Sequence, residues 1–337
     1  MKKLSILFIL SFTILFLMCS DKEDKKEETN LNQSAYILCQ GSWMKSNASI
    51  FLYDLKNNAL SDKKYLGIGD VVDDGILYND KIYMASYGDN QLLILDTKNG
   101  KIDSVDLAGA GPQSVAIAND KIYITCDNID SVYILKLSDY SKIKSIYTGS
   151  DPWAITAYKG KVYVANTEYD ESTYSYGQGK VAVIENDSLI KTIEVGTNPT
   201  DVTIINGALY VLCTGDYYSI NSTVYEYNID NYSLIDSLDL GYMGVTKLIT
   251  YENEIYSTIL YSQGFMGILK YNISLSPESI EEFLNYGTHI TINDDNILVT
   301  KSTTYSDPGF LFILNKNTKE VIDSVQVGIA PSYIIVK

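Results

Sequence analysis

Aromatic side chains recur in the long polar loops of this sequence, where they could stack on a flat ligand. The candidate contacts are Trp43, Tyr87, Tyr174, Tyr217 and Tyr261 from these loops, together with Trp153 from the corner GSDPW. Each offers a rigid apolar face with one polar group, which suits a large amphiphilic molecule or a protein surface. Gln113 and Asp201, which lie in glycine-proline corners, are the candidate polar partners. With 29 tyrosines in the chain, the alternative remains open that some of these rings only pack against neighbouring loops.

Residues that could support catalysis or bind a metal are scarce. His289 is the single histidine, which excludes copper or zinc sites built from several histidines. The sequence contains neither a Gly-x-Ser-x-Gly nucleophile motif nor a calcium loop. We therefore predict a non-enzymatic protein with no catalytic residue, no metal and no cofactor. The alternative is a lactonase-like or lyase-like enzyme that acts through carboxylates or His289.

The candidate loops belong to a repeat that occurs seven times. Its marker is a short strand with tyrosine as the third residue, at Tyr83, Tyr123, Tyr163, Tyr210 and Tyr256, with Leu298 in the last copy and Tyr36, one place earlier in its segment, in the first. The spacing of about 40 to 47 residues is the period of a four-stranded propeller blade. Each copy also contains two further strands and, in most cases, a Gly-x-x-Pro corner before the first strand. The sequence predicts an all-β fold, a seven-bladed β-propeller over residues 34–337.

The two ends of the repeat region complement each other. The first copy begins near Ser34 without a corner strand, and the last residues, GIAPSYIIVK, form a corner strand with no copy after them. We therefore expect the C-terminal strand to complete the first blade and remove the open edges. Cys39, Cys126 and Cys213 close equivalent strands of separate blades, too far apart for a disulfide, and are predicted to be core residues.

One face of the predicted propeller is suited to binding. The loops between second and third strands vary in length and carry most of the aromatic candidates, whereas the turns on the opposite face are short and alike. A rigid scaffold with one variable face usually binds through that face. Its charge is mostly acidic, and Lys45, Lys247 and Lys301 are the exceptions.

The N-terminus has the composition of a targeting segment. Lys2 and Lys3 precede an apolar run that ends at Cys19, which predicts a lipoprotein signal peptide over residues 1–18 and lipidation of Cys19. Residues 19–33 are charged and predict a flexible tether. We expect an outer-membrane protein, lipid-anchored and exposed at the cell surface, with an uncleaved anchor or periplasmic retention as alternatives. The net charge of −16 disfavours nucleic acid as a partner.

The segments GPQSVAIANDKIYITCDNIDSVYIL, DPWAITAYKGKVYVANT and NPTDVTIINGALYVL carry a family resemblance. They resemble the YVTN repeats of YncE-like seven-bladed propellers. Together with the lipoprotein signal and the acidic tether, the chain resembles the Bacteroidetes surface lipoproteins that capture cobalamin above a TonB-dependent transporter.

This resemblance implies a ligand and a partner. The ligand is a corrinoid bound on the loop-rich face, and the partner is a TonB-dependent outer-membrane transporter that receives it. Alternatives are a glycan-binding or protein-interaction propeller. The corners GYMGVTKL and GTHITI depart from Gly-x-x-Pro, which leaves the shape of the pocket open. No short motif defines the ligand contacts of the family, so the site residues above rest on their own chemistry.

Overall fold

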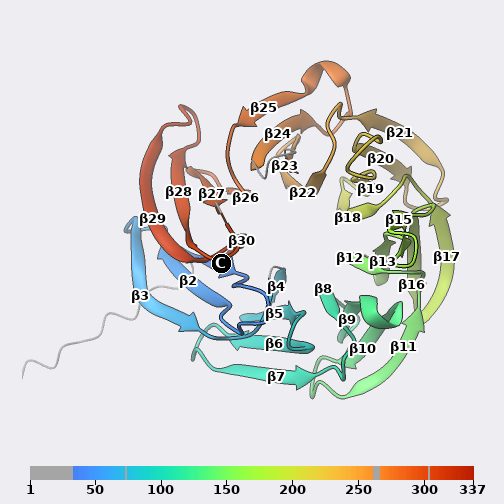
Figure 1. Cartoon of the computed structure of the whole chain (residues 1–337), viewed down its shortest axis with the longest axis horizontal. Coiled ribbons are helices and arrows are strands. Elements are labelled where there is room, and N and C mark those ends of the chain that lie inside the picture. The colour runs from blue at the N-terminus through green and yellow to red at the C-terminus, as the bar shows by residue number, and fades with distance from the viewer. Residues whose placement is uncertain (1–32, 73, 261–265, 303) are drawn as a thin grey trace, which may run out of the picture. The chain divides into compact units, whose positions relative to one another are not determined.

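The computed structural model describes residues 33–72, 74–260, 266–302 and 304–337. Seven four-stranded antiparallel sheets surround a central channel, and the predicted all-β, seven-bladed propeller is confirmed (Figure 1). The signal peptide, Cys19 and nearly all of the tether lie outside the described residues. Within the described ranges, no helix is long and apolar enough to cross a membrane.

Each blade has four strands, numbered outward from the channel. The first strands, next to the channel, are β30 (Pro331–Val336), β4 (Gly75–Tyr78), β8 (Pro112–Ala118), β12 (Pro152–Tyr158), β18 (Pro199–Ile205), β22 (Val245–Tyr251) and β26 (His289–Ile292). The second strands are β1 (Ser34–Cys39), β5 (Lys81–Ser86), β9 (Lys121–Cys126), β13 (Lys161–Asn166), β19 (Ala208–Cys213), β23 (Glu254–Leu260) and β27 (Asn296–Lys301).

The outer half of each blade follows the same order. The third strands are β2 (Ser49–Asp54), β6 (Gln91–Asp96), β10 (Ser131–Lys136), β16 (Lys180–Glu185), β20 (Thr223–Asn228), β24 (Met266–Asn272) and β28 (Pro308–Asn315). The fourth strands are β3 (Ala59–Leu66), β7 (Ile102–Asp106), β11 (Lys142–Tyr147), β17 (Ser188–Glu194), β21 (Leu234–Asp239), β25 (Glu281–Leu284) and β29 (Val321–Ile329). The remaining elements are the hairpin β14 (Tyr169–Asp170) and β15 (Ser175–Tyr176) and the 3₁₀ turns η2 (Asp127–Ile129) and η3 (Pro277–Ser279).

The C-terminal strand closes the ring as expected. β30 pairs antiparallel with β1, with Ile335 opposite Tyr36, and the first blade has the order β3-β2-β1-β30. The backbone N–H of Lys337 also donates to the carbonyl oxygen of Ser34 at 3.0 Å. The strand β1 begins at Ser34, so Tyr36 is its third residue. Tyr36 therefore occupies the same strand position as the tyrosines of the other copies of the repeat.

The hydrophobic core is divided among the interfaces between neighbouring blades. Seven buried clusters fill these interfaces, each drawing its residues from two successive blades. Cys39, Cys126 and Cys213 are buried in three of them, which confirms their interpretation as core residues. Burial raises the pKa of the Cys39 and Cys126 thiols to about 12, so both stay protonated.

The repeated tyrosine connects some of the blades to the next one through its hydroxyl. The Tyr123 hydroxyl donates to Asp187 Oδ1 at 3.0 Å, and Lys121 Nζ lies 2.5 Å from Asp187 Oδ2, in the turn between the third and fourth strands of the following blade. Tyr210 donates to the carbonyl oxygen of Ile273 in the same way, at 2.7 Å. The tyrosine ring fills the interface between two blades, and at Tyr123 and Tyr210 the hydroxyl also bonds to the next blade.

We expect Tyr123→Phe to lower the free energy of unfolding by about 1–2 kcal/mol, because a partly buried hydrogen bond to a carboxylate is lost while the ring is kept. Urea denaturation measures the change. Tyr147→Phe is the control, since Tyr147 is 65% exposed on the outer strand β11. An equal loss in both variants would contradict the role given to the Tyr123 hydroxyl.

Candidate functional site

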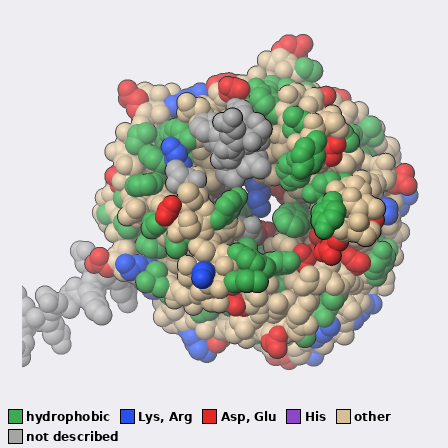
Figure 2. Space-filling model, viewed as in Figure 1, with side chains coloured by type: hydrophobic (Ala, Val, Ile, Leu, Met, Phe, Trp, Pro, Cys, Tyr) green, Lys and Arg blue, Asp and Glu red, His purple; other side chains and the backbone are tan. Residues whose placement is uncertain are grey.

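The variable loops place apolar side chains around the central opening, as Figure 2 shows. Trp43 and Tyr87, from the loops of the first and second blades, form a pair with ring centroids 5.6 Å apart. Trp43 is still 53% exposed, so much of its surface is available to a ligand. Two of the six predicted aromatic contacts therefore lie together on one side of this face.

A second aromatic group is built around the inserted hairpin β14–β15. Tyr176 lies between Tyr169 and Tyr217, with centroid distances of 5.0 and 6.3 Å. Tyr174, beside the tip of the hairpin, is 83% exposed. Tyr217 thus joins this group, Tyr174 extends from it towards solvent, and the predicted contact Tyr261 lies outside the described residues.

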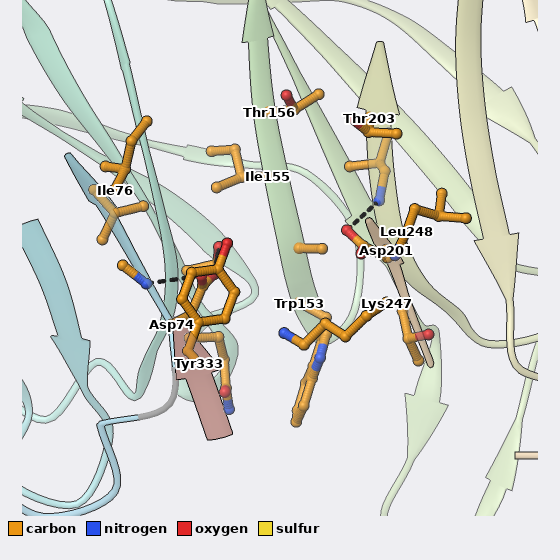
Figure 3. Close-up of a pocket in the computed structure, with 17 residues that line it drawn as sticks. Asp74, Ile76, Trp153, Ile155, Thr156, Asp201, Thr203, Lys247, Leu248 and Tyr333 are labelled. Atoms are coloured by element: carbon orange, nitrogen blue, oxygen red, sulfur yellow. Dashed lines mark hydrogen bonds between the residues drawn. The ribbon is translucent and has the colours of Figure 1, made fainter. Parts of the chain in front are cut away.

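A cavity of about 220 Å³ lies in the channel between the first strands of the blades (Figure 3). Three predicted residues, Gln113, Trp153 and Asp201, line it. The other described lining residues are Asp74, Gly75, Ile76, Ser114, Val115, Ala154, Ile155, Thr156, Thr200, Val202, Thr203, Lys247, Leu248 and Tyr333. The lining of the cavity is mainly polar and includes the charged residues Asp74, Asp201 and Lys247, with Trp153 and Tyr333 as its aromatic side chains.

The strand register reveals a set of equivalent residues around this channel. In every blade, one residue of the first strand pairs with the third residue of the second strand, as Ile76 does with Tyr83 and Ile249 with Tyr256. Two positions before that partner, the blades carry Asp74, Ser114, Ala154, Asp201, Lys247, His289 and Tyr333. We call these seven residues the channel ring. Six of them carry a polar or titratable group.

The carboxylates of the channel ring are bonded within the wall. Asp201 Oδ1 accepts the backbone N–H of Val202 at 2.8 Å, and its Oδ2 accepts that of Leu248 at 2.7 Å. Burial raises the pKa of Asp201, and the nearby Lys247 opposes this shift. Asp74 accepts the N–H of Gly75 at 2.7 Å and the hydroxyl of Ser114. These carboxylates therefore hold first strands in place as well as lining the cavity.

His289 is enclosed behind the cavity wall. It is 3% exposed, and its ring lies 4.4 Å from that of Tyr333. Burial, and then the charge of Lys247, lowers the pKa of His289 to about 3. The imidazole is therefore neutral at physiological pH, and it packs against Tyr333 as part of the wall.

Lys247 and Tyr333 are two of the lining residues that the sequence analysis did not predict as ligand contacts. Lys247 is predicted only as a cation on an acidic face, because its corner lacks the Gly-x-x-Pro motif that precedes β8, β12, β18 and β30. Tyr333 lies in the closing strand β30, outside the variable loops that carry most of the predicted aromatic contacts. Counting back from the tyrosine repeat with the strand register could have identified both.

Asp127 hydrogen-bonds to Gln113, one of the two residues predicted to be polar contacts of the ligand. Its Oδ2 accepts a hydrogen bond from Gln113 Nε2 at 2.8 Å, whereas its buried Oδ1 has no hydrogen-bond partner. Burial is the main reason that the pKa of Asp127 is raised to about 6, and the charge of Asp151 adds to the shift. Gln113 is thus oriented by a carboxyl group that changes charge near neutral pH.

The same carboxyl borders an acidic hollow on the loop face. This hollow, of about 610 Å³, is lined by Asp127, Asn128, Asp130, Ser150, Asp151, Glu168, Tyr169, Asp170 and Glu171. Glu168 is paired with Lys180 Nζ at 3.0 Å. In the part of the chain that the structure describes, no group of three or more His, Cys, Asp and Glu residues is placed to hold a metal ion.

We expect Asp127→Asn to stabilise the protein at pH 8 and to have little effect at pH 4. The folded state favours the protonated carboxyl, so ionisation costs stability as the pH rises through about 6. After allowance for solvent screening the gain is on the order of 1 kcal/mol, measured as a shift of Tm. Asp216→Asn should have the opposite sign at pH 8, because hydrogen bonds from Ser219 and neighbouring backbone N–H groups lower the pKa of Asp216. A pH-independent difference for Asp127→Asn would contradict the prediction.

Comparison with known proteins identifies the fold alone. No protein-family model matches the chain, and no curated protein matches it at a significant level. Among solved structures, it is similar to a Bacteroides uniformis protein described as a candidate 6-phosphogluconolactonase, with a TM-score of 0.64, 12% identity and coverage of 91% of this chain and 100% of that chain.

Two further structures are similar at comparable identity. The Kuenenia stuttgartiensis hydrazine synthase chain has a TM-score of 0.62 at 13% identity, covering 77% of this chain and 88% of that one. BamB from Moraxella catarrhalis has a TM-score of 0.56 at 13% identity, covering 88% and 91%. Because one fold hosts many functions, these similarities support the β-propeller architecture and assign no activity.

Proposed function

We propose that this propeller is a non-enzymatic capture protein for a large amphiphilic small molecule, with a corrinoid such as cobalamin as the leading ligand. The observation that carries the proposal is the placement of two aromatic groups and Trp153 on the face where a polar cavity opens. A corrinoid presents a flat ring, amide arms and a nucleotide tail. The rings can stack on it, and polar groups near the channel can pair with its arms.

A glycan is the rival ligand, because sugars also stack on tyrosine and tryptophan. Calorimetry with cyanocobalamin, dicyanocobinamide and a panel of oligosaccharides distinguishes the two. We expect heat of binding and a change in the visible spectrum with the corrinoids. Heat with oligosaccharides alone would replace the leading ligand, and no response to any of these compounds would leave protein interaction as the remaining binding function.

We further propose that the protein is lipid-anchored through Cys19 at the outer surface of the outer membrane and delivers its ligand to a TonB-dependent transporter. The apolar run ending in Cys19 and the charged tether support the anchor. A flexible tether of this length spans roughly 20 Å, and shared anchoring raises the effective concentration of the two proteins. The aromatic face would then lie over the transporter, with the ligand between them.

Protease treatment of intact cells tests the location, since a surface protein is digested without lysis. Cross-linking in cells tests the partner, with photoreactive groups at Tyr174 and Tyr217 on the loop face and at Tyr147 on the outer strand β11 as a control. We expect cross-links to a transporter from the first two positions alone. Protection from protease until lysis would replace the surface location with a periplasmic one.

A further inference from the structure

The side-chain amide of Gln113 is bonded at one end only. Gln113 belongs to β8 and lines the cavity, and its Nε2 donates to Asp127 Oδ2 at 2.8 Å. Asp127 borders the acidic hollow on the loop face and is not among the described residues of the cavity lining. Among the described residues, no donor bonds to Gln113 Oε1. The amide therefore has its nitrogen fixed by a group beyond the lining, while its carbonyl oxygen is available to a ligand.

The carboxyl group of Asp127 is itself held in place. The backbone N–H of Asp127 donates to the carbonyl oxygen of Gly111 at 3.0 Å. Gly111 has a φ of +65°, and a Cβ at this position would overlap Asp127 Oδ1, so the carboxyl packs directly on the glycine. The Tyr87 hydroxyl also faces this carboxyl, since burial and then the charge of Asp127 raise the pKa of Tyr87. A carboxyl group fixed in this way can determine the orientation of the amide that it binds.

The charge state of Asp127 decides which end of the Gln113 amide it can bind. An ionised carboxylate accepts hydrogen bonds and donates none, so it binds the NH₂ end and excludes the flipped amide, in which two acceptor oxygens would meet. Burial, and to a lesser extent the charge of Asp151, raises the pKa of Asp127 to about 6, so the group is ionised at pH 8. Below this pKa the protonated carboxyl can donate as well, and both orientations of Gln113 become possible.

The titratable groups around Asp127 determine the pH range of this change. Tyr87 stays protonated at neutral pH, because its pKa is raised. Burial also raises the pKa of Asp151, which lies in the corner before β12, so the two carboxyl groups influence each other as they titrate. The other titratable groups of the hollow and its border are Cys126, Asp130, Glu168 with its partner Lys180, Asp170 and Glu171.

The charged groups of the cavity lining also favour a hydrogen-bond donor. Figure 3 shows Asp74, Asp201 and Lys247 around the cavity. Lys247 is engaged within the chain, because its charge opposes the effect of burial on the pKa of Asp201. Asp74 accepts a backbone N–H and the hydroxyl of Ser114, and both bonds favour its charged form. Two carboxyl groups and one ammonium make the lining better suited to a group that donates hydrogen bonds than to an anion.

We propose that Gln113 is a specificity-determining residue, which Asp127 orients so that its carbonyl oxygen accepts a hydrogen bond from a ligand group in the cavity. The cavity thereby selects an uncharged group with an N–H, such as an amide, over a group of the same shape that only accepts. Its volume of about 220 Å³ holds one such group rather than a whole large ligand. The inference rests on the ligand-capture function proposed above and names the chemistry of the group that enters the channel.

Two fluorinated probes that differ in one heavy atom test this selection. The amide 4-fluoro-N-methylbenzamide has an N–H where the ester methyl 4-fluorobenzoate has an oxygen, and both are uncharged. ¹⁹F NMR with the wild-type protein measures both dissociation constants. At pH 8 we expect the amide to bind about fivefold to tenfold more tightly, the ratio that one hydrogen bond provides. Equal affinities, tighter binding of the ester, or no binding of either probe at millimolar concentration would overturn the proposal.

The pH dependence and a pair of variants show whether Asp127 sets the orientation. In the wild-type protein the preference for the amide should decrease from pH 8 to pH 5, as Asp127 becomes protonated. Asp127→Asn should reduce the preference at pH 8 and make it independent of pH, because an asparagine amide can both donate and accept. A purely structural role of Asp127 would instead change the affinities for both probes equally.

Asp130→Asn is the matched control for this variant. It removes one charge from the same hollow, but Asp130 Oδ1 accepts the backbone N–H of Asp151 at 3.0 Å and does not bond to Gln113. The control should keep the preference and its pH dependence, and melting curves establish that each variant is folded. A preference that does not change with pH, or that Asp127→Asn leaves intact, would show that Asp127 does not orient Gln113.

A last comparison separates this inference from the corrinoid function. If the cavity receives an amide arm of the ligand, cyanocobalamin should displace 4-fluoro-N-methylbenzamide, and Gln113→Leu should weaken the binding of both. If the amide is preferred but neither cyanocobalamin nor dicyanocobinamide binds, the donor-selecting cavity stands and the corrinoid function fails. If both corrinoids bind and the amide is not preferred to the ester, the function stands and the role given to Gln113 is wrong.

Discussion

Deletion of residues 330–337 is expected to leave no folded monomer. The deletion removes β30 and exposes the whole hydrogen-bonding edge of β1. It also removes Ile334 and Ile335, which are buried in the interfaces with the seventh and second blades. Loss of one such side chain costs about 2–5 kcal/mol, so losing both is comparable to the roughly 5–15 kcal/mol that stabilises a typical domain, and the lost pairing of β30 with β1 adds to this cost.

Size-exclusion chromatography and circular dichroism would show aggregation or loss of the cooperative melting transition. Lys337→Met is the control, because it keeps β30 and removes only the contacts of Lys337 Nζ with Asp80 Oδ1 at 2.7 Å and Thr97 Oγ1 at 2.9 Å. That variant should fold with a slightly lower Tm. A truncated protein that remains monomeric and melts at the wild-type temperature would show that ring closure is not required.

Trp153→Ala is expected to weaken the binding of cyanocobalamin by roughly 100-fold, because a buried aromatic anchor typically contributes 2–3 kcal/mol to a binding site. Trp153 lines the cavity and is 38% exposed, so its ring is available to a ligand. Its carbonyl oxygen accepts a hydrogen bond from Thr125 Oγ1 at 2.8 Å, which positions the residue before the ligand arrives.

Calorimetry measures this loss. Tyr147→Ala removes an exposed aromatic side chain from the outer strand β11 and should leave affinity unchanged. Tyr174→Ala should have an intermediate effect, since Tyr174 is 83% exposed beside the hairpin tip and has less of its surface fixed by neighbours. Equal affinities for Trp153→Ala and Tyr147→Ala would exclude the channel mouth as the corrinoid site.

The fold could be predicted because each copy of the repeat packs against its neighbouring blades in the same way. Tyr123 and Tyr210 fill equivalent interfaces and bond to equivalent turns, so the sequence shows the same residue at the same interval. The closing strand was predictable for a similar reason, since GIAPSYIIVK has the corner and alternation of a first strand. Local pattern and global fold agree in this part of the chain.

The site was less predictable because it depends on contacts between blades. Loop topology placed Trp43 and Tyr87 on one face, but their pairing at 5.6 Å depends on the shapes of two loops. Asp201 lines the cavity, and its bond to Leu248 N–H depends on the backbone of the next blade. The role of Asp127 in holding Gln113 had no sequence signal, because an aspartate after a strand is common in loops.

The hairpin β14–β15 shows how this architecture can acquire new recognition surfaces. It is inserted between β13 and β16, which nevertheless pair without interruption from Lys161 opposite Glu185 to Asn166 opposite Lys180. The bonds that join Lys161 to Tyr232 and Lys121 to Asp187 lie at the turns of the opposite face and are untouched by the insertion. The length of this loop can therefore change during evolution without altering the strand register of the blade. The protein is accordingly a suitable host for loop grafting, in which the segment between Thr167 and Gly179 is exchanged for a library and selected for new ligands.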